Sequence, residues 1–206
     1  LALLPAIYRS RGQLACLVVP KRERPCLFDA GQAVRLAEDG AVLVAEQGDG
    51  ELLLIACGSY QLSEMLRAGA RLAQAGHGYR LVYLQEPGRF RAARDALEGT
   101  VLASDELRER LFPRARDRRV LLCHLRPEVA RGHLWPLLAD AGRSAALGFI
   151  NRGGTLDVAG MLFANRSTWA HVLEACAGLL AVPPTSLLGA DELAALAGTG
   201  DPRVLR

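Results

Sequence analysis

The chain has 206 residues, of which 50% are hydrophobic and 23% charged, and its formal net charge is +3. These values predict a soluble globular protein with one ordinary core and exclude a disordered chain. So small a charge, with an aromatic content of only 5%, argues against a nucleic-acid partner.

The first predicted elements precede residue 40. Residues 14–20, LACLVVP, predict a strand, and four charged residues follow at 21–24. Pro25 interrupts the chain, and we expect a short helix from there to a glycine at position 40. The strand would leave an exposed apolar edge in a free-standing domain, so we assign residues 1–25 to the end of a preceding domain and its linker. The chain does not begin with methionine, and one explanation is that it belongs to a longer protein.

Two apolar runs come next, at 41–47 and 51–57. Gly48-Asp49-Gly50 separates them and predicts a tight antiparallel hairpin. The second run, ELLLIAC, is continuous, which is typical of a strand buried on both faces. Apolar residues at helical spacing then predict a helix that ends at Gly76.

The rest of the chain alternates strands with helices. Strands are expected at 79–85, 118–125 and 144–150. Helices are expected at 89–99, from Pro127 with a kink or early end at Pro136, and from about Thr168 to Pro183. Strands separated by helix-sized segments favour parallel pairing. We therefore predict an α/β fold of three layers, α/β/α, around a mostly parallel five-stranded sheet with one antiparallel edge. This domain is assigned to residues 26–185, with a C-terminal tail at 186–206.

The cysteines and the N-terminus bear on the cellular compartment. The five cysteines are odd in number and contain no C-x-x-C pair, which predicts a reduced, cytoplasmic protein. Cys16, Cys57 and Cys123 lie in apolar runs, where a free cysteine behaves as a small buried hydrophobe. The start, LALLPAIYRSRGQ, does not have the form of a signal peptide. No run approaches the roughly 18 apolar residues of a membrane span, so we expect no membrane partner.

A search for catalytic motifs finds none. The three G-x-G sequences lack the third glycine of a dinucleotide fingerprint, and no phosphate loop or serine-hydrolase elbow occurs in the sequence. The four histidines never fall into a metal-ligand spacing. His124 ends a predicted buried strand, where open α/β sheets bind ligands; the alternative is a structural histidine bonded to a loop carbonyl. The sequence is therefore interpreted as a binding or regulatory module, or as an accessory domain of an enzyme whose catalytic residues lie elsewhere.

Residues 17–40, LVVPKRERPCLFDAGQAVRLAEDG, resemble the segment of phosphoketolases where the pyrimidine-binding domain ends and the C-terminal domain begins. That segment is a strand, a K-Q-P-R-P-Q-like motif and a short helix that runs to a glycine. Here the motif reads KRERPC and matches at three of six positions. Residues 52–76, 118–138 and 146–175 follow in the order of a transketolase-type C-terminal domain, so the resemblance extends from about 14 to 180.

The resemblance implies the C-terminal portion of a phosphoketolase-like enzyme. The whole enzyme would use thiamine diphosphate and Mg²⁺ to cleave a ketose phosphate, either xylulose 5-phosphate or fructose 6-phosphate. Its partners would be its own N-terminal and middle domains, the sugar phosphate and a second copy in a homodimer. The alternatives are a transketolase-like enzyme, a xylulose 5-phosphate epimerase-type relative, and a free-standing α/β binding module. No catalytic, cofactor-binding or metal-binding residue is assigned to this chain, which alone would be inert.

One substrate-binding residue is implied by the resemblance. Lys21 falls on the motif lysine that, in phosphoketolases, reaches the phosphate of the sugar substrate. A lysine offers a compact, mobile charge to a dianionic phosphate. Arg22 and Arg24 could assist, although no motif match singles them out. The alternative is a solvated charged loop.

Gly48-Asp49-Gly50 invites comparison with the metal motif of thiamine-diphosphate enzymes. That motif requires an asparagine roughly 25 to 30 residues after the aspartate, because the two side-chain oxygens complete the shell of Mg²⁺. The two asparagines of the chain, Asn151 and Asn165, are far too distant. We therefore interpret Gly48-Asp49-Gly50 as a turn.

Overall fold

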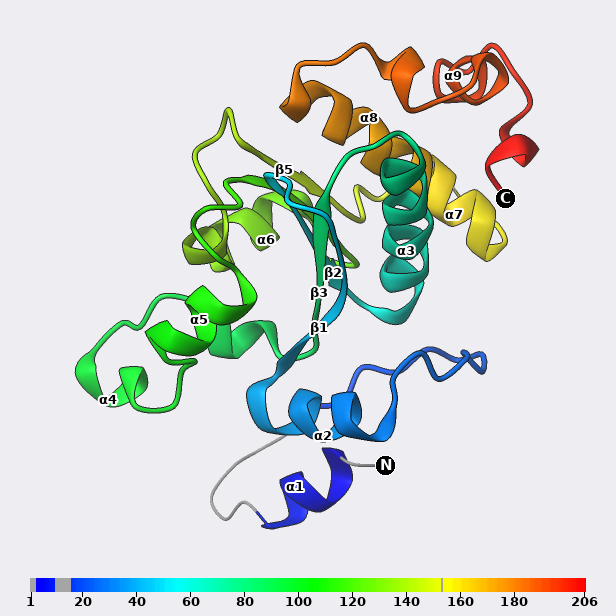
Figure 1. The fold of residues 1–206 in the computed structure, drawn as a ribbon. Coiled ribbons are helices and arrows are strands. Elements are labelled where there is room, and N and C mark those ends of the chain that lie inside the picture. Colours follow the sequence, from blue (N-terminus) through cyan, green and yellow to red (C-terminus); the bar gives the residue numbers. More distant parts are fainter. Residues whose placement is uncertain (1–2, 10–15, 153) are drawn as a thin grey trace.

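The computed structural model describes residues 3–9, 16–152 and 154–206, and its centre is one five-stranded sheet with helices on both faces (Figure 1). The strands are β1 (Ala41–Gln47), β2 (Leu52–Cys57), β3 (Tyr79–Leu84), β4 (Arg118–Cys123) and β5 (Ser144–Leu147). Their order across the sheet is β1-β3-β2-β4-β5, in which β1 is antiparallel to β3 and the other pairs are parallel. The predicted three-layer α/β/α fold with a mixed sheet is confirmed.

The helices divide between the two faces of the sheet. The α-helices are α1 (Leu3–Arg9), α2 (Ala30–Asp39), α3 (Ser59–Gln74), α4 (Ala96–Gly99), α5 (Asp105–Leu111), α6 (Pro127–His133), α7 (Val158–Ala164), α8 (Trp169–Leu180) and α9 (Ala190–Leu196). The 3-10 turns are η1 (Pro87–Phe90), η2 (Trp135–Leu137), η3 (Pro184–Ser186) and η4 (Pro202–Leu205). Helices α3 and α8 cover one face, and α5 and α6 cover the other (Figure 1).

Alternation along the central strands creates two cores. Leu54 and Leu122 point toward α3 and α8, where they pack with Met65 and other buried side chains. Ile55 and Leu121, one residue out of phase, pack on the opposite face with the segments around η1, α5 and α6. All of β2 is buried, so the continuous apolar run at 51–57 is explained by a strand with a core on each side.

The predicted hairpin is wrong, although the antiparallel edge is correct. Strand β1 pairs with β3 rather than with β2, so the loop at 48–50 crosses the start of β3. A Cβ on Gly50 would lie 2.1 Å from the carbonyl oxygen of Gly78, and two glycines allow the backbones to approach this closely. The edge position suits β1, because its exposed end carries Glu46, which pairs with Arg80 and Arg116.

The helix expected at 89–99 is also wrong. The segment forms the 3-10 turn η1, an irregular stretch and only the single turn α4. The carboxylate of Asp95 accepts the backbone N–H of Glu98 at 2.8 Å and so starts a new turn there. Glu98 also forms ion pairs with Arg91 and Arg94, and these contacts stabilise a loop in place of a longer helix.

Other boundaries follow the expectations. Helix α6 begins at Pro127 and ends before the 3-10 turn that contains Pro136. Helix α2 begins after Asp29, whose side chain accepts the N–H of Gln32, and ends at Gly40, which has a φ of 74°.

The two ends of the chain differ from the predicted strand at 14–20 and the predicted tail at 186–206. Within the expected strand at 14–20, residues 14 and 15 lie outside the described part, and 16–20 are irregular and exposed. At the other end, residues 186–206 form α9 and η4 and place Leu187, Leu188 and Leu205 in the core with α3 and α8. The domain limits at 25 and 185 stay predictions.

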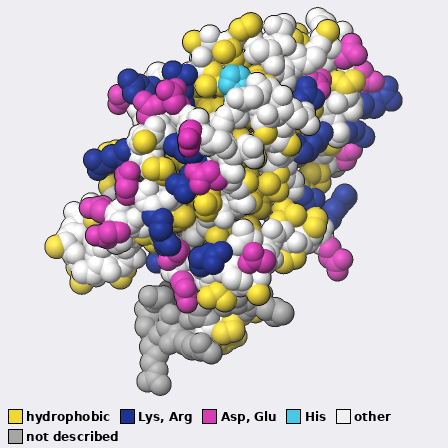
Figure 2. Space-filling model, viewed as in Figure 1, with side chains coloured by type: hydrophobic (Ala, Val, Ile, Leu, Met, Phe, Trp, Pro, Cys, Tyr) yellow, Lys and Arg dark blue, Asp and Glu magenta, His cyan; other side chains and the backbone are white. Residues whose placement is uncertain are grey.

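None of the helices in the described parts of the chain is long and apolar enough to cross a membrane. On the face shown in Figure 2, basic and acidic side chains are interspersed rather than gathered into a patch of one sign.

Candidate functional site

The carboxyl edge of the parallel strands is the first candidate site, because open α/β sheets bind ligands there. Strand β2 ends at Cys57, β4 ends at Cys123, and His124 follows. Two cavities adjoin this edge, one of about 240 Å³ and one of about 400 Å³, and His124 lines both. The first is lined mainly by apolar side chains from α7 and the loop after β5.

His124 has the arrangement of a structural residue. Its side chain is exposed, and its Nδ1 lies 3.3 Å from the carbonyl oxygen of Cys57. The contact supports a structural histidine bonded to a backbone carbonyl, although this carbonyl belongs to the last residue of β2 and not to a loop. Across residues 3–9, 16–152 and 154–206, no group of three histidine, cysteine or acidic side chains could hold a metal ion.

The thiols at this edge do not have the properties of nucleophiles. Burial raises the pKa of Cys57 to about 12, and it raises the pKa of Cys123 to about 11. Both therefore stay protonated at neutral pH, and the thiolate is the reactive form. Of the three cysteines expected in the core from their apolar surroundings, Cys57 and Cys123 are buried and Cys16 is exposed.

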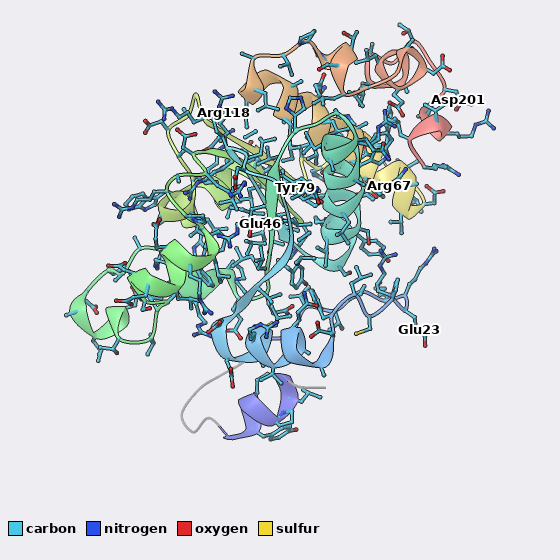
Figure 3. The ribbon with its side chains drawn as sticks, viewed as in Figure 1. Glu23, Glu46, Arg67, Tyr79, Arg118 and Asp201 are labelled. Carbon is cyan, nitrogen blue, oxygen red and sulfur yellow. The ribbon has the colours of Figure 1, made fainter. Side chains whose placement is uncertain are left out.

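The second candidate is the charged segment that leads into α2. Lys21 is exposed, and it is the only lysine among the 25 basic residues of the chain. Figure 3 labels Glu23 in the same segment, on a loop that projects to the right of α2. Lys21 and His124 thus come from different elements, an irregular segment and the end of β4.

Arg24 fixes this segment to the sheet domain. Its Nη2 donates to Ser63 Oγ at 2.6 Å, and its guanidinium carbon lies 4.4 Å from the centre of the Tyr60 ring. Both partners are on the first turns of α3, three residues apart, and therefore on one helix face. The Nε–H of Arg24 is buried and has no acceptor among the described residues. Sequence reasoning noted Arg24 without a role, because a contact 39 residues away leaves no local pattern.

Beside Arg24, Glu64 joins α3 to α8. The backbone N–H of Trp169 donates to Glu64 Oε2 at 2.8 Å, so this carboxylate satisfies a donor at the start of α8. Burial raises the pKa of Glu64; the Trp169 N–H and the charges of Arg67 and Arg24 oppose that shift. The hydroxyl of Thr168, the usual capping group at this position, is instead 2.7 Å from His171 Nδ1.

The sequence that was compared with a metal motif lies away from the carboxyl edge of the sheet. Gly48-Asp49-Gly50 is a loop before β2, at the opposite end of that strand from the carboxyl edge. Gly48 has a φ of 59°, and Gly50 contacts the backbone of Gly78, so the loop is explained by the crossing. The interpretation of this sequence as a turn agrees with its place in the fold.

Comparisons with known proteins give a fold likeness only. Neither a protein-family profile nor a curated protein sequence matches the chain. Among solved structures, the transketolase from Leishmania mexicana superposes with a TM-score of 0.52 at 17% identity, over 75% of this chain and 20% of that one. A transketolase from Pichia stipitis in complex with xylulose 5-phosphate gives 0.48 at 19% identity, over 78% and 21%. The transketolase from Campylobacter jejuni gives 0.46 at 13% identity, over 72% and 19%.

The likeness to the Leishmania enzyme shows that the chain shares an α/β fold with part of that transketolase. The chain spans about a fifth of the length of the transketolase that it matches.

Proposed function

We propose that this chain is the C-terminal portion of a transketolase-like, thiamine-diphosphate-dependent enzyme that acts on a ketose phosphate. The observation that carries the proposal is the sheet order β1-β3-β2-β4-β5 with one antiparallel edge, in a fold shared with a transketolase. The resemblance of residues 17–40 to phosphoketolases refines it toward cleavage of xylulose 5-phosphate or fructose 6-phosphate.

In this proposal the chain does not hold the cofactor. The diphosphate and Mg²⁺ would be bound by the N-terminal and middle domains, which would also pair in a homodimer. The present residues would brace the middle domain and present Lys21 to the sugar phosphate. Arg24 gives that role a physical basis, because its bonds to α3 hold the segment three residues after Lys21. Binding a remote phosphate supplies energy that can be used at the reacting carbon.

The activity is tested with the complete enzyme, thiamine diphosphate and Mg²⁺. Xylulose 5-phosphate and inorganic phosphate are supplied in one assay, and xylulose 5-phosphate and an aldose phosphate in another. Acetyl phosphate in the first assay supports a phosphoketolase, and a longer ketose phosphate in the second supports a transketolase. Substrate that is only epimerised would favour the epimerase-type relative. No turnover in any assay, from a gene product near the 22.1 kDa of this chain, would favour the free-standing module.

The role of Lys21 is tested by Lys21→Ala in the complete enzyme. A charge-assisted hydrogen bond to phosphate contributes about 1.5–3 kcal/mol, so KM for the sugar phosphate should rise about tenfold or more while kcat changes less. The matched control is Arg94→Ala, which removes a cationic side chain that is 84% exposed and lies outside the segment around Lys21. Equal kinetics for the two variants would return Lys21 to the solvated-loop interpretation.

A further inference from the structure

Two adjoining cavities flank α7. One, of about 240 Å³, is lined mainly by apolar side chains, including Phe149 and Met161. The other, of about 300 Å³, lies between α3, α7 and the C-terminal turn η4, and it is lined by four arginines: Arg24, Arg67, Arg203 and Arg206. Tyr60, Val158 and Leu162 line both cavities. A single small ligand could therefore extend from one into the other.

The arginine cavity has an excess of positive charge. Among the described residues that line it, Glu64 is the one carboxylate. At its rim, Arg203 pairs with Asp201 at 2.7 Å and Arg206 pairs with Asp157 at 3.1 Å. Setting those pairs aside leaves the side chains of Arg24 and Arg67 against that of Glu64, so the cavity has one cationic side chain in excess.

Arg24 is the arginine of this cavity whose described contacts are all with neutral groups. Arg67 lies 3.8 Å from Glu64 and donates to the carbonyl oxygen of Arg206 at 3.0 Å, so it already has partners. Arg24 is bound to the neutral groups of Ser63 and Tyr60, and its buried Nε–H lacks an acceptor among the described residues. An anion in the cavity would give this guanidinium a charged partner, which neither Ser63 nor Tyr60 provides.

The apolar cavity is formed by a helix that is incompletely covered. All seven residues of α7, VAGMLFA, are apolar or glycine, and none of them is buried. Next to it, Phe149 is 38% exposed and Leu156 is 48% exposed. Covering such apolar area is favourable by roughly 25 cal/mol per Å². A ring or short alkyl group in this cavity would gain that energy.

We propose that the two cavities together bind a small organic anion, a phosphate monoester or a carboxylate that carries a compact apolar group such as an aromatic ring. The anionic group binds Arg24, and the apolar group lies between Met161, Leu162 and Phe149. The site is distinct from Lys21 and does not depend on the proposed enzymatic function.

The two methionines of the chain allow a direct test by NMR. With ¹³C-methyl methionine, Met161 reports on the cavity, and Met65, which is 0% exposed in the core, is an internal control. Met161→Leu assigns the two signals. Phenyl phosphate and benzoate are the two probes, and inorganic phosphate, ribose 5-phosphate and benzyl alcohol are the comparison compounds. We expect at least one probe to shift the Met161 signal saturably and leave Met65 in place.

The contribution of each half of the site is measured by affinity. The aromatic anion should bind at least tenfold more tightly than inorganic phosphate, ribose 5-phosphate or benzyl alcohol, because each of these engages only one cavity. Arg24→Gln should weaken binding of the anion at least tenfold and leave the weak binding of benzyl alcohol unchanged. Arg94→Gln is the matched control, since Arg94 is 84% exposed beside α4 on the other side of the sheet (Figure 1).

Three results would overturn the proposal. The first is the absence of any saturable Met161 shift with either probe in the unmodified protein. The second is equal affinity for the aromatic anion and for inorganic phosphate or ribose 5-phosphate, which would mean a simple anion patch. The third is equal affinity for the aromatic anion and benzyl alcohol, which would mean a purely apolar pocket. The first readout needs no substitution at Arg24, so it is independent of how that variant folds.

Discussion

Replacing His171 should reduce the amount of folding stability that the protein loses when the pH is lowered. His171 lies in α8 and is 4% exposed, and burial, assisted by the charge of Arg166, lowers its pKa to about 4 from an ordinary value of 6.5. The unfolded chain therefore binds a proton between pH 6.5 and pH 4 that the folded chain excludes. The resulting stability is fully present above pH 6.5 and is lost as the pH falls toward 4. Each pKa unit corresponds to about 1.4 kcal/mol, so the loss from pH 7.5 to pH 4.5 is roughly 2–3 kcal/mol.

The test compares urea unfolding at these two pH values for the parent protein and His171→Asn. Asparagine places a polar atom near the position of Nδ1, which lies 2.7 Å from the hydroxyl of Thr168. The variant should be less stable at pH 7.5 and should lose roughly 2–3 kcal/mol less on acidification. Val172→Ala, also buried in α8, lowers stability without removing an ionisable group and should keep the pH dependence of the parent. Parallel curves for His171→Asn and the parent protein would refute the reasoning.

Three further outcomes are expected. Glu64→Gln should match or exceed the parent protein in urea unfolding at pH 7, because it keeps an acceptor for Trp169 without a buried charge, whereas Glu64→Ala should lose about 1–3 kcal/mol. An equal loss for both variants would contradict this. Gly50→Ala should lower the unfolding midpoint, because the new Cβ would collide with the Gly78 carbonyl, and Gly88→Ala, with open space around it, should not. The native protein should react with a thiol reagent at the two exposed cysteines, Cys16 and Cys26. The three buried cysteines, Cys57, Cys123 and Cys176, should react only in denaturant. Labelling of more than two thiols without denaturant would show that the core opens.

Sequence patterns predicted the parts of the fold that local physics determines. The run at 52–57 is apolar at every position because β2 has a core on each face. Such a continuous apolar run can be recognised in the sequence alone. The choice of partner for β1 is different, because it depends on which strand offers a free edge. Nothing within 41–50 distinguishes a hairpin from a crossing over Gly78, and a short loop of glycines permits both.

The candidate site was less accessible to sequence reasoning. Lys21 came from a family resemblance, and its contact with a phosphate stays a prediction. The docking of Arg24 on Tyr60 and Ser63 joins an irregular segment to a helix, so neither periodicity nor a motif marks it. The same holds for Glu64. In the sequence it is one of several charged residues of an amphipathic helix, and only the structure shows that it accepts a hydrogen bond from the start of α8.

The single lysine has a practical consequence for locating the neighbours of this chain. A reagent that couples a lysine amine to carboxylates would begin every side-chain link at one atom, Nζ of Lys21. Links that start from a side chain of these 206 residues would then all be measured from a single known origin. The acidic residues recovered by mass spectrometry would outline the surroundings of Lys21 as a sphere whose radius is the length of the reagent.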